Sequence, residues 1–263
     1  MDEMKTIIVI PARYGSTRFP GKPLKPIKGK SLLERTVAIA KAVKNVDNVL
    51  VATDDERIAS HAQEIGAQAV MTSEKCENGT ERVYEAIQNI GYKPDAIINL
   101  QGDAVLTPPW IIQAIVDAMN ADSSIELATP ATQLTWEQYD KLAASKANGA
   151  AGGTTVTFDL NHNALYFSKS LIPYLRDKSQ PMPPVFRHIG LYGYRHDCLS
   201  RYLQLKQTPL ESSEKLEQLR ALENGIPIKV ILVDYKGRSH WAIDSPDDVT
   251  IAESIIEKEG ELV

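Results

Sequence analysis

Short β-branched runs alternate with amphipathic segments through the first half of the chain. Residues 6–10 (TIIVI), 48–53 (NVLVAT), 67–71 (AQAVM) and 95–101 (DAIINLQ) have the length and composition of buried strands. Strands that alternate with helices form βαβ units around a mainly parallel sheet. The pattern therefore predicts the α/β class, with a sheet flanked by helices.

Two helices between these strands are marked by the residues at their ends. Ser31 and Glu34 form a capping box at the start of residues 31–44, and Thr80 opens a second helix that closes on Gly91. A capping box satisfies two backbone N–H groups that the helix itself leaves unpaired. Both segments are therefore predicted to be helical.

The alternation becomes less regular after Leu106. Prolines start a predicted helix at residues 108–120, and Thr135 and Gln138 form a capping box at the start of residues 135–142. The other predicted elements are strands at residues 124–131, 154–159, 163–169 and 188–195, a loop or hinge at 145–153, and helices at 212–225 and 245–260, the last with Ser245 as N-cap.

The composition is that of a soluble globular protein of 263 residues, 43% of them hydrophobic, which is long enough for one large domain. A net charge of −5 and a pI near 5.6 argue against a nucleic acid or an anionic membrane as partner. Cys76 and Cys198 lack the spacing of a disulfide framework or a zinc site. Because neither a signal peptide nor a membrane-spanning run is predicted, we expect a cytoplasmic location.

A basic, glycine-rich segment, IPARYGSTRFPGKPL, follows the first predicted strand and carries Arg13, Arg18 and Lys22 among Gly15 and Gly21. At this edge of an open α/β sheet, backbone N–H groups can face phosphate oxygens. The segment is not a P-loop, because five residues rather than four separate the glycines and a proline follows the lysine. We expect it to bind a small anionic ligand; a surface loop with incidental basic residues is the alternative.

Two carboxylates are candidates for the Mg²⁺ that accompanies a nucleoside triphosphate. Asp103 follows the strand at 95–101 on the same sheet edge, and Asp244 precedes the last predicted helix. Mg²⁺ is usually held by one or two carboxylates together with phosphate oxygens. Each residue could instead be a turn or capping aspartate, the role expected for Asp54 and Asp55 after the second strand.

Eight motifs occur in order along about residues 5–255: IPARYGSTRFPGKPL, VATDDERI, NGTERV, INLQGD, ALYFSKSLIP, RHIGLYGYR, LEQLRALENG and IDSPDD. The set resembles the cytidylyltransferases that activate 3-deoxy-manno-octulosonate (Kdo), the CMP-Kdo synthetases. The first motif is shared with CMP-sialic acid synthetases, whereas ALYFS, HIGLYGYR and LEQLR favour the Kdo family. The resemblance implies a nucleotidyltransferase fold similar to GT-A folds.

The resemblance implies a reaction of CTP with the anomeric hydroxyl of an acidic sugar, which releases pyrophosphate and serves lipopolysaccharide or capsule synthesis. Its implied sites are Arg13 and Lys22 with the backbone near Ala12, Gly15 and Ser16 for the triphosphate, Arg82 and Gln101 for the cytidine end, Asp103 and Asp244 for Mg²⁺, and His188, Tyr192, Glu217 and Gln218 for the sugar.

One cytidylyltransferase domain over residues 1–263 is implied by the same resemblance. Its nucleotide-binding part spans about residues 1–120 and 225–263, and a smaller β-rich part at about 121–224 binds the sugar and forms a homodimer. On the spacing of the strand residues, His188 and Tyr192 are expected on one face of a single strand.

The chain departs from the family pattern at three of these motifs, and the first departure lies beside the metal loop. QGDAV replaces the usual QGDEP, NGTER replaces SGTDR, and Lys169 stands in YFSK where YFSR is usual. A lysine cannot clamp a carboxylate through two parallel hydrogen bonds, so Lys169 predicts an altered sugar contact. The acceptor could be Kdo, 8-amino-Kdo, a sialic-type sugar or a phosphonate. A metal-dependent glycosyltransferase and a nucleotide-binding protein without turnover remain alternatives.

Overall fold

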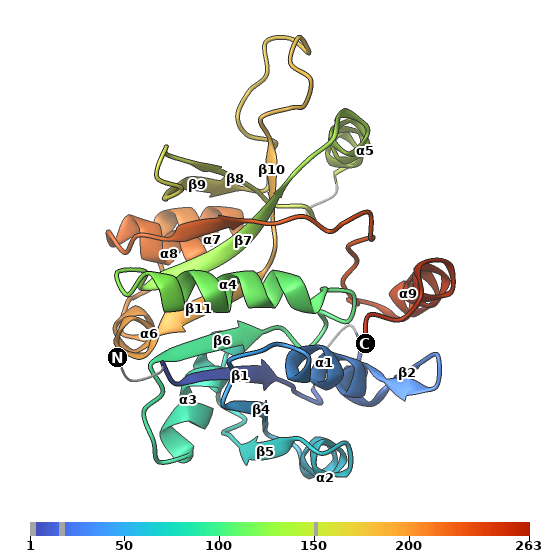
Figure 1. Cartoon of the computed structure of the whole chain (residues 1–263), viewed down its shortest axis with the longest axis vertical. Coiled ribbons are helices and arrows are strands. Elements are labelled where there is room, and N and C mark those ends of the chain that lie inside the picture. Colours follow the sequence, from blue (N-terminus) through green and yellow to red (C-terminus); the bar gives the residue numbers. More distant parts are fainter. Residues whose placement is uncertain (1–3, 16–18, 150–151) are drawn as a thin grey trace.

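The computed structural model describes residues 4–15, 19–149 and 152–263, and a 10-stranded mixed sheet runs through it (Figure 1). Its strands are β1 (Thr6–Pro11), β4 (Asn48–Thr53), β5 (Gln68–Met71), β6 (Ala96–Leu100), β7 (Leu127–Gln133), β8 (Thr155–Phe158), β9 (Ala164–Ser168), β10 (Phe186–His188), β11 (Leu191–Arg195) and β12 (Lys229–Leu232). They lie in the order β5-β4-β1-β6-β11-β7-β10-β8-β9, with β12 beside β7. The predicted α/β class is confirmed.

The sheet changes character at β6. The strands β5, β4, β1 and β6 pair in parallel, whereas β6, β11, β7, β10, β8 and β9 pair in antiparallel fashion. A separate small hairpin is formed by β2 (Pro26–Ile27) and β3 (Lys30–Ser31). One continuous sheet therefore spans both predicted parts of the chain, and the division of roles between those parts stays a prediction.

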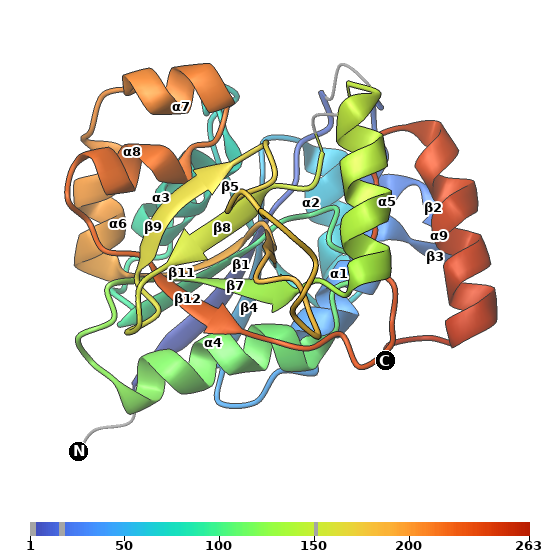
Figure 2. The same cartoon turned by 90° about the horizontal axis from the view of Figure 1, so that it is seen from above.

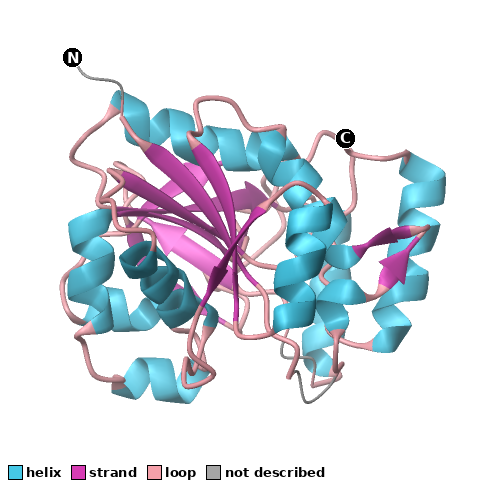
Figure 3. Ribbon diagram, turned by 90° about the horizontal axis from the view of Figure 1, so that it is seen from below, coloured by secondary structure: helices cyan, strands magenta, loops and turns pink. Residues whose placement is uncertain are grey.

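Helices cover both faces of the sheet (Figures 2 and 3). They are α1 (Leu32–Lys41), α2 (Glu56–Glu64), α3 (Gly79–Asn89), α4 (Pro109–Ala121), α5 (Trp136–Ala147), α6 (His196–Leu203), α7 (Pro209–Glu214), α8 (Gln218–Glu223) and α9 (Pro246–Glu259), with a 3-10 turn η1 (Lys22–Leu24). Along β1, Ile8 and Ile10 join the core that contains α1 and α4, while Ile7 and Val9 join the core that contains α3, α6 and α8. Strands buried on both faces have continuous apolar runs, as TIIVI does.

Local signals at the helix starts are largely confirmed. Ser31, Thr135 and Ser245 each form the capping box of the helix that follows. The predicted start of α3 at Thr80 is one residue late, because the helix begins at Gly79 with Asn78 as its N-cap. Helix α5 also continues to Ala147, into the predicted loop at 145–153.

The predicted strand at 188–195 is confirmed over Leu191–Arg195, where β11 lies, but His188 belongs to a separate strand, β10. β10 ends at His188 and β11 begins at Leu191, and both pair with the same edge of β7, since β12 pairs with the other edge. Ile189 and Gly190 interrupt this pairing, and there the Ile189 N–H donates to the Pro130 carbonyl of β7 at 3.0 Å. His188 and Tyr192 are thus on different strands, yet their ring centroids lie 5.6 Å apart, so the two side chains meet as the prediction expected.

The predicted helix at 212–225 is wrong. It is divided into α7 and α8 at Lys215, whose backbone is left-handed at φ 53°. Arg220 fixes this bend, since its Nε and Nη2 donate to the buried carboxylate of Glu211 at 2.8 and 2.5 Å. Within the described ranges, none of the helices is both long and apolar enough to cross a membrane.

Gly193 leaves no space for a side chain between β11 and α4. An added Cβ would lie 2.6 Å from Ile115 Cγ2 and 2.6 Å from Met119 Sδ, and both of these side chains are fully buried. We expect Gly193→Ala to lower the free energy of unfolding by about 1–3 kcal/mol because the core is overpacked. Denaturant unfolding measures this loss, and Gly190→Ala is the matched control, since its Cβ would meet nothing within 4 Å. Equal stability of the two variants would contradict the packing argument.

Candidate active site

The parallel strands meet at a point where ligands bind in open α/β sheets. From β1 the chain proceeds to β4 and β5 on one side, and then to β6 on the other. A crevice forms outside the carboxyl ends of such strands where the order reverses. Gly102 lies there, just after β6, and an added Cβ would be 2.8 Å from the Pro11 carbonyl oxygen. Only glycine allows this approach of the two strand ends.

Lys22 is held at the centre of this edge. Its Nζ donates to Asp103 Oδ2 at 3.0 Å and to the Ile243 carbonyl at 2.8 Å. A cavity of about 340 Å³ opens beside it, lined by Arg13, Lys22, Gln101, Asp103 and Asp244 together with Ala12, Pro11, Pro23, Cys76, Glu77, Asn78, Gly79, Arg82 and Gly102. The structure thus gathers the predicted nucleotide and metal residues in one place.

The loop after β1 has an ordered start. Ala12 is buried and its N–H donates to the Ala52 carbonyl at 2.8 Å, while Arg13 is exposed and lines the cavity. Gly15 lines an adjoining hollow of about 360 Å³ that Arg13 shares. The predicted contacts of Ser16, and the nearby Arg18, lie outside the described residues.

Arg82 is buried at 3% exposure and is oriented by two partners. Its Nη2 donates to Asp54 Oδ2 at 2.6 Å and its Nη1 donates to Thr72 Oγ1 at 2.6 Å. The expected capping role is filled by Asp55 alone, which accepts from the Arg57 N–H. Sequence reasoning missed Asp54 as the partner of Arg82, because this pair joins positions 28 residues apart.

Two further residues of the cavity were not predicted. Asn78 caps α3 and Cys76 precedes it, and both line the cavity. The Cys76 thiol donates to Glu85 Oε2 at 3.0 Å. Burial and this carboxylate raise the pKa of Cys76 to about 11, so the thiol is protonated at neutral pH. Asn78 is the first residue of the NGTER motif and Cys76 lies two residues before it, so this motif was the sequence signal that could have identified both residues.

His188 and Tyr192 belong to a row of aromatic rings that contact one another in tilted or edge-to-face arrangements. Their ring centroids are 5.6 Å apart, and His188 lies 5.0 Å from Phe167. The two side chains are 8% and 5% exposed. Burial, with nearby His240, lowers the pKa of His188 to about 3, so its ring is neutral at pH 7. Its Nε2 lies 2.8 Å from Thr129 Oγ1.

Glu217 and Gln218 lie at the start of α8. Glu217 Oε1 accepts from Thr80 Oγ1 at 2.9 Å, and burial raises the pKa of this carboxyl. Gln218 is 4% exposed, and its Nε2 has no hydrogen-bond partner among the described residues. Lys169 follows β9, and its N–H donates to Glu214 Oε2 at 2.9 Å. None of the predicted sugar residues lines the nucleotide cavity, so their role stays a prediction.

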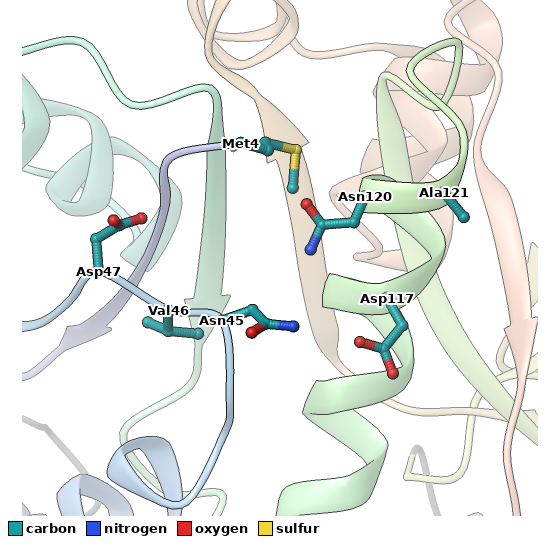
Figure 4. A pocket seen from close by; sticks show the side chains of 7 residues that line it. All are labelled: Met4, Asn45, Val46, Asp47, Asp117, Asn120 and Ala121. Carbon is teal, nitrogen blue, oxygen red and sulfur yellow. The ribbon is translucent and has the colours of Figure 1, made fainter. Parts of the chain in front are cut away.

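A larger hollow of about 510 Å³ lies between the loop before β4 and α4 (Figure 4). Its charged residues are Asp47 and Asp117, and both already accept hydrogen bonds, from the Thr6 N–H at 2.7 Å and from Gln113 Nε2 at 2.8 Å. Without a lysine or arginine among its lining residues, this hollow would repel a triphosphate. The smaller cavity with Lys22 is therefore the better anion site.

The donors at the Lys22 cavity suit a Mg²⁺–triphosphate. Asp103 and Asp244 supply hard oxygen ligands, and Mg²⁺ needs only one or two carboxylates when phosphates complete its coordination. Among the described residues there is no group of three or more acidic, His or Cys side chains placed to hold a metal ion. The site therefore fits a metal that arrives with its nucleotide better than a permanently bound one.

Comparison with known proteins decides the family. The cytidylyltransferase family profile matches residues 7–231. The 3-deoxy-manno-octulosonate cytidylyltransferase of Maricaulis maris is 52% identical over 260 residues, which cover 99% of this chain and 100% of that protein. The chain belongs to the 3-deoxy-manno-octulosonate cytidylyltransferase family. The mitochondrial family member of Arabidopsis thaliana is 40% identical, over 96% of this chain and 83% of that protein.

A solved structure of the same family agrees with the fold. The structure of a CMP:2-keto-3-deoxy-manno-octonic acid synthetase, complexed with CTP, matches with a TM-score of 0.86 and 34% identity, covering 97% of this chain and 99% of that one. A cytidylyltransferase from Leptospira borgpetersenii at 18% identity and a TM-score of 0.63 supports the fold alone.

The thiol of Cys76 offers a test of the cavity in this family member. Because the pKa of Cys76 is raised from the usual 9.0 to about 11, its thiolate fraction at pH 8 is about a hundredfold smaller than in an unperturbed thiol. We expect slow alkylation by iodoacetamide at pH 8, rising as the pH approaches 11. Glu85→Gln should accelerate it, since it removes the nearby negative charge.

Mass spectrometry of the alkylated peptides measures these rates residue by residue. Cys198, which is fully buried, is the internal control for unfolding and should remain unmodified. Rapid alkylation of Cys76 at pH 8 in the folded protein would contradict the geometry given for its thiol.

Proposed function

We propose that this chain joins CTP to the anomeric hydroxyl of Kdo, releasing pyrophosphate and forming CMP-Kdo. The observation that carries the proposal is the convergence of Lys22, Asp103 and Asp244 on one cavity in a member of this family. The anomeric oxygen attacks the α-phosphorus of CTP, the bond to the bridging oxygen of pyrophosphate breaks, and the hydroxyl proton is released. Positioning and charge neutralisation contribute most to such transfers.

The residues of the cavity divide this work. Lys22 and Arg13 place positive charge beside the triphosphate, and the strand ends at Pro11 and Gly102 bring backbone close to it. We propose that Asp103 and Asp244 hold Mg²⁺, which would neutralise phosphate charge and lower the pKa of the attacking hydroxyl.

Arg82 is proposed to act at the cytidine end of the cavity, together with Gln101. Asp54 and Thr72 fix its guanidinium, so its direction is set before the ligand binds. On the sugar side we propose His188, Tyr192, Glu217, Gln218 and Lys169 as the acceptor residues. The family identity supports Kdo over a sialic-type sugar or a phosphonate as acceptor.

Pyrophosphate release tests the proposal. With CTP and Mg²⁺ we expect turnover with Kdo, and we expect little with ATP or GTP or without an acid acceptor. The acceptor panel contains Kdo, 8-amino-Kdo, a sialic-type sugar and a small phosphonate. Turnover with another acid in place of Kdo would contradict Kdo as the acceptor. CTP binding without turnover with any acid would favour a nucleotide-binding protein without catalytic activity.

Two variants identify the site within the same assay. Asp103→Asn and Lys22→Ala should each lower kcat by about a hundredfold or more, because each removes a charge that acts at the phosphates. Asp47→Asn is the matched control, since Asp47 lies at the other hollow. Full activity of Asp103→Asn would refute the metal assignment.

We also propose a homodimer formed through the part after residue 120, and a cytoplasmic location. The support is the family resemblance together with exposed apolar side chains in this part, at Leu160, Leu165 and Tyr174. The segment between β9 and β10 that carries Tyr174 projects from the top of the molecule (Figure 1).

Light scattering should therefore give twice the chain mass of 29.1 kDa. Leu165→Asp places a charge on the edge strand β9 and should yield monomers, whereas Met71→Asp on the opposite edge strand β5 should not. A monomeric mass for the unaltered chain would contradict the proposal.

A further inference from the structure

We propose that Thr80 and Asn99 are positioning residues that couple nucleotide binding at Gln101 to acceptor binding at Glu217 and Gln218. The inference rests on the proposed function, and it gives a role in the site to two buried side chains that stand in the NGTERV and INLQGD motifs but do not line the cavity. It is carried by a chain of hydrogen bonds that joins the two ends of the site.

The chain runs in one direction through four side chains. Gln101 Nε2 donates to Asn99 Oδ1 at 3.4 Å, and Asn99 Nδ2 donates to Thr80 Oγ1 at 3.3 Å. Thr80 Oγ1 then donates to Glu217 Oε1 at 2.9 Å. The Thr80 hydroxyl both accepts and donates, so its loss interrupts the chain from both sides. Bonds aligned in this way polarise one another.

The two middle members have a position that packing alone does not explain. Asn99 is fully buried in β6, whose other residues are Ala96, Ile97, Ile98 and Leu100. Thr80 is 1% exposed in α3. An amide in an apolar sheet interior is costly unless its hydrogen bonds are made. Asn99 therefore needs the hydroxyl of Thr80, and Thr80 in turn orients Glu217.

The end of the chain at Gln101 lies in the nucleotide cavity. The two links nearest to it, at 3.4 and 3.3 Å, are longer than the 2.9–3.0 Å typical of amide donors. A nucleotide that contacts Gln101 can therefore shorten and align these links. The ordering is transmitted to Thr80 through the Asn99 amide, which is fully buried and bonds to both neighbours.

The far end of the chain is rigidly held and carries an unused donor. Tyr202 OH donates to the Glu217 carbonyl at 2.8 Å, which fixes the backbone at the start of α8. The next side chain, Gln218, keeps an amide nitrogen without a partner among the described residues, at 4% exposure. A hydroxyl-rich acid such as Kdo offers acceptors for such a group, so orientation of Glu217 and Gln218 affects acceptor affinity.

Coupling of this kind must be reciprocal, because each ligand changes the affinity of the other by the same factor. The test measures the dissociation constant of an α,β-methylene analogue of CTP by calorimetry, with and without saturating Kdo. In the unaltered protein we expect saturating Kdo to lower the dissociation constant of the CTP analogue by about tenfold. Thr80→Val should reduce the ratio of the dissociation constants without and with Kdo to about one. The kcat/KM for Kdo should fall in the same variant.

Two matched variants separate coupling from simple damage. Thr80→Ser keeps the hydroxyl and should restore the tenfold ratio. Thr6→Val makes the same change at a fully buried threonine whose Oγ1 has no hydrogen-bond partner among the described residues, and it should leave the ratio unchanged. If Thr80→Val does not fold, Thr80→Ala also removes the hydroxyl and interrupts the chain of hydrogen bonds, and alanine has a higher helix propensity than valine.

The outcomes distinguish this inference from the proposed function. If the unaltered protein turns over CTP and Kdo but shows no coupling, or if Thr80→Val retains the ratio, the positioning role is overturned and the function stands. If the unaltered protein neither binds CTP nor turns it over with any acid, the proposed function itself fails. A ratio lost in Thr80→Val and restored in Thr80→Ser establishes the coupling.

Discussion

A single ammonium group joins three segments that are far apart along the chain. Lys22 comes from the loop after the first strand, Asp103 from the loop after β6, and Ile243 from the linker before the last helix. The lysine and the aspartate are each partly exposed, so their charges are only partly desolvated. Since the cavity for the anion is built around this contact, the position of each other ligand group is defined relative to it.

The change from parallel to antiparallel pairing at β6 separates two tasks within one sheet. The parallel strands end together and present loops at a common edge, as needed for a phosphate site. The antiparallel strands β10 and β11 follow one another along the same edge of β7, and they bring His188 and Tyr192 together across the interruption at Ile189 and Gly190. A continuous sheet therefore connects the cavity to the buried aromatic row without a flexible linker between them.

Prediction from the sequence succeeded where the information is local. The strand at 48–53 and the capping boxes at Ser31, Thr135 and Ser245 depend on neighbouring residues, and the structure has them as expected. The sheet-edge rule also brought Lys22 and Asp103 together, although they are 81 residues apart.

The errors arose where distant contacts decide the backbone. Nothing in HIGLYGYR reveals that its pairing along β7 is interrupted at Ile189 and Gly190. The apolar pattern of 212–225 likewise continues through a residue that the Arg220–Glu211 pair holds in a left-handed turn. The pairing of Asp54 with Arg82 was missed for the same reason, because VATDDERI contains a complete local explanation for both aspartates.

The contact between Lys22 and Ile243 spans 221 residues, which has a consequence for how the protein is made. During synthesis the first strand and its basic loop emerge early, while the linker that completes the cavity emerges only after all strands of the sheet have been translated. Closing so long a loop is slow, and its entropy is lost before the contact is gained. Ligand-binding competence is therefore among the last properties the nascent chain acquires.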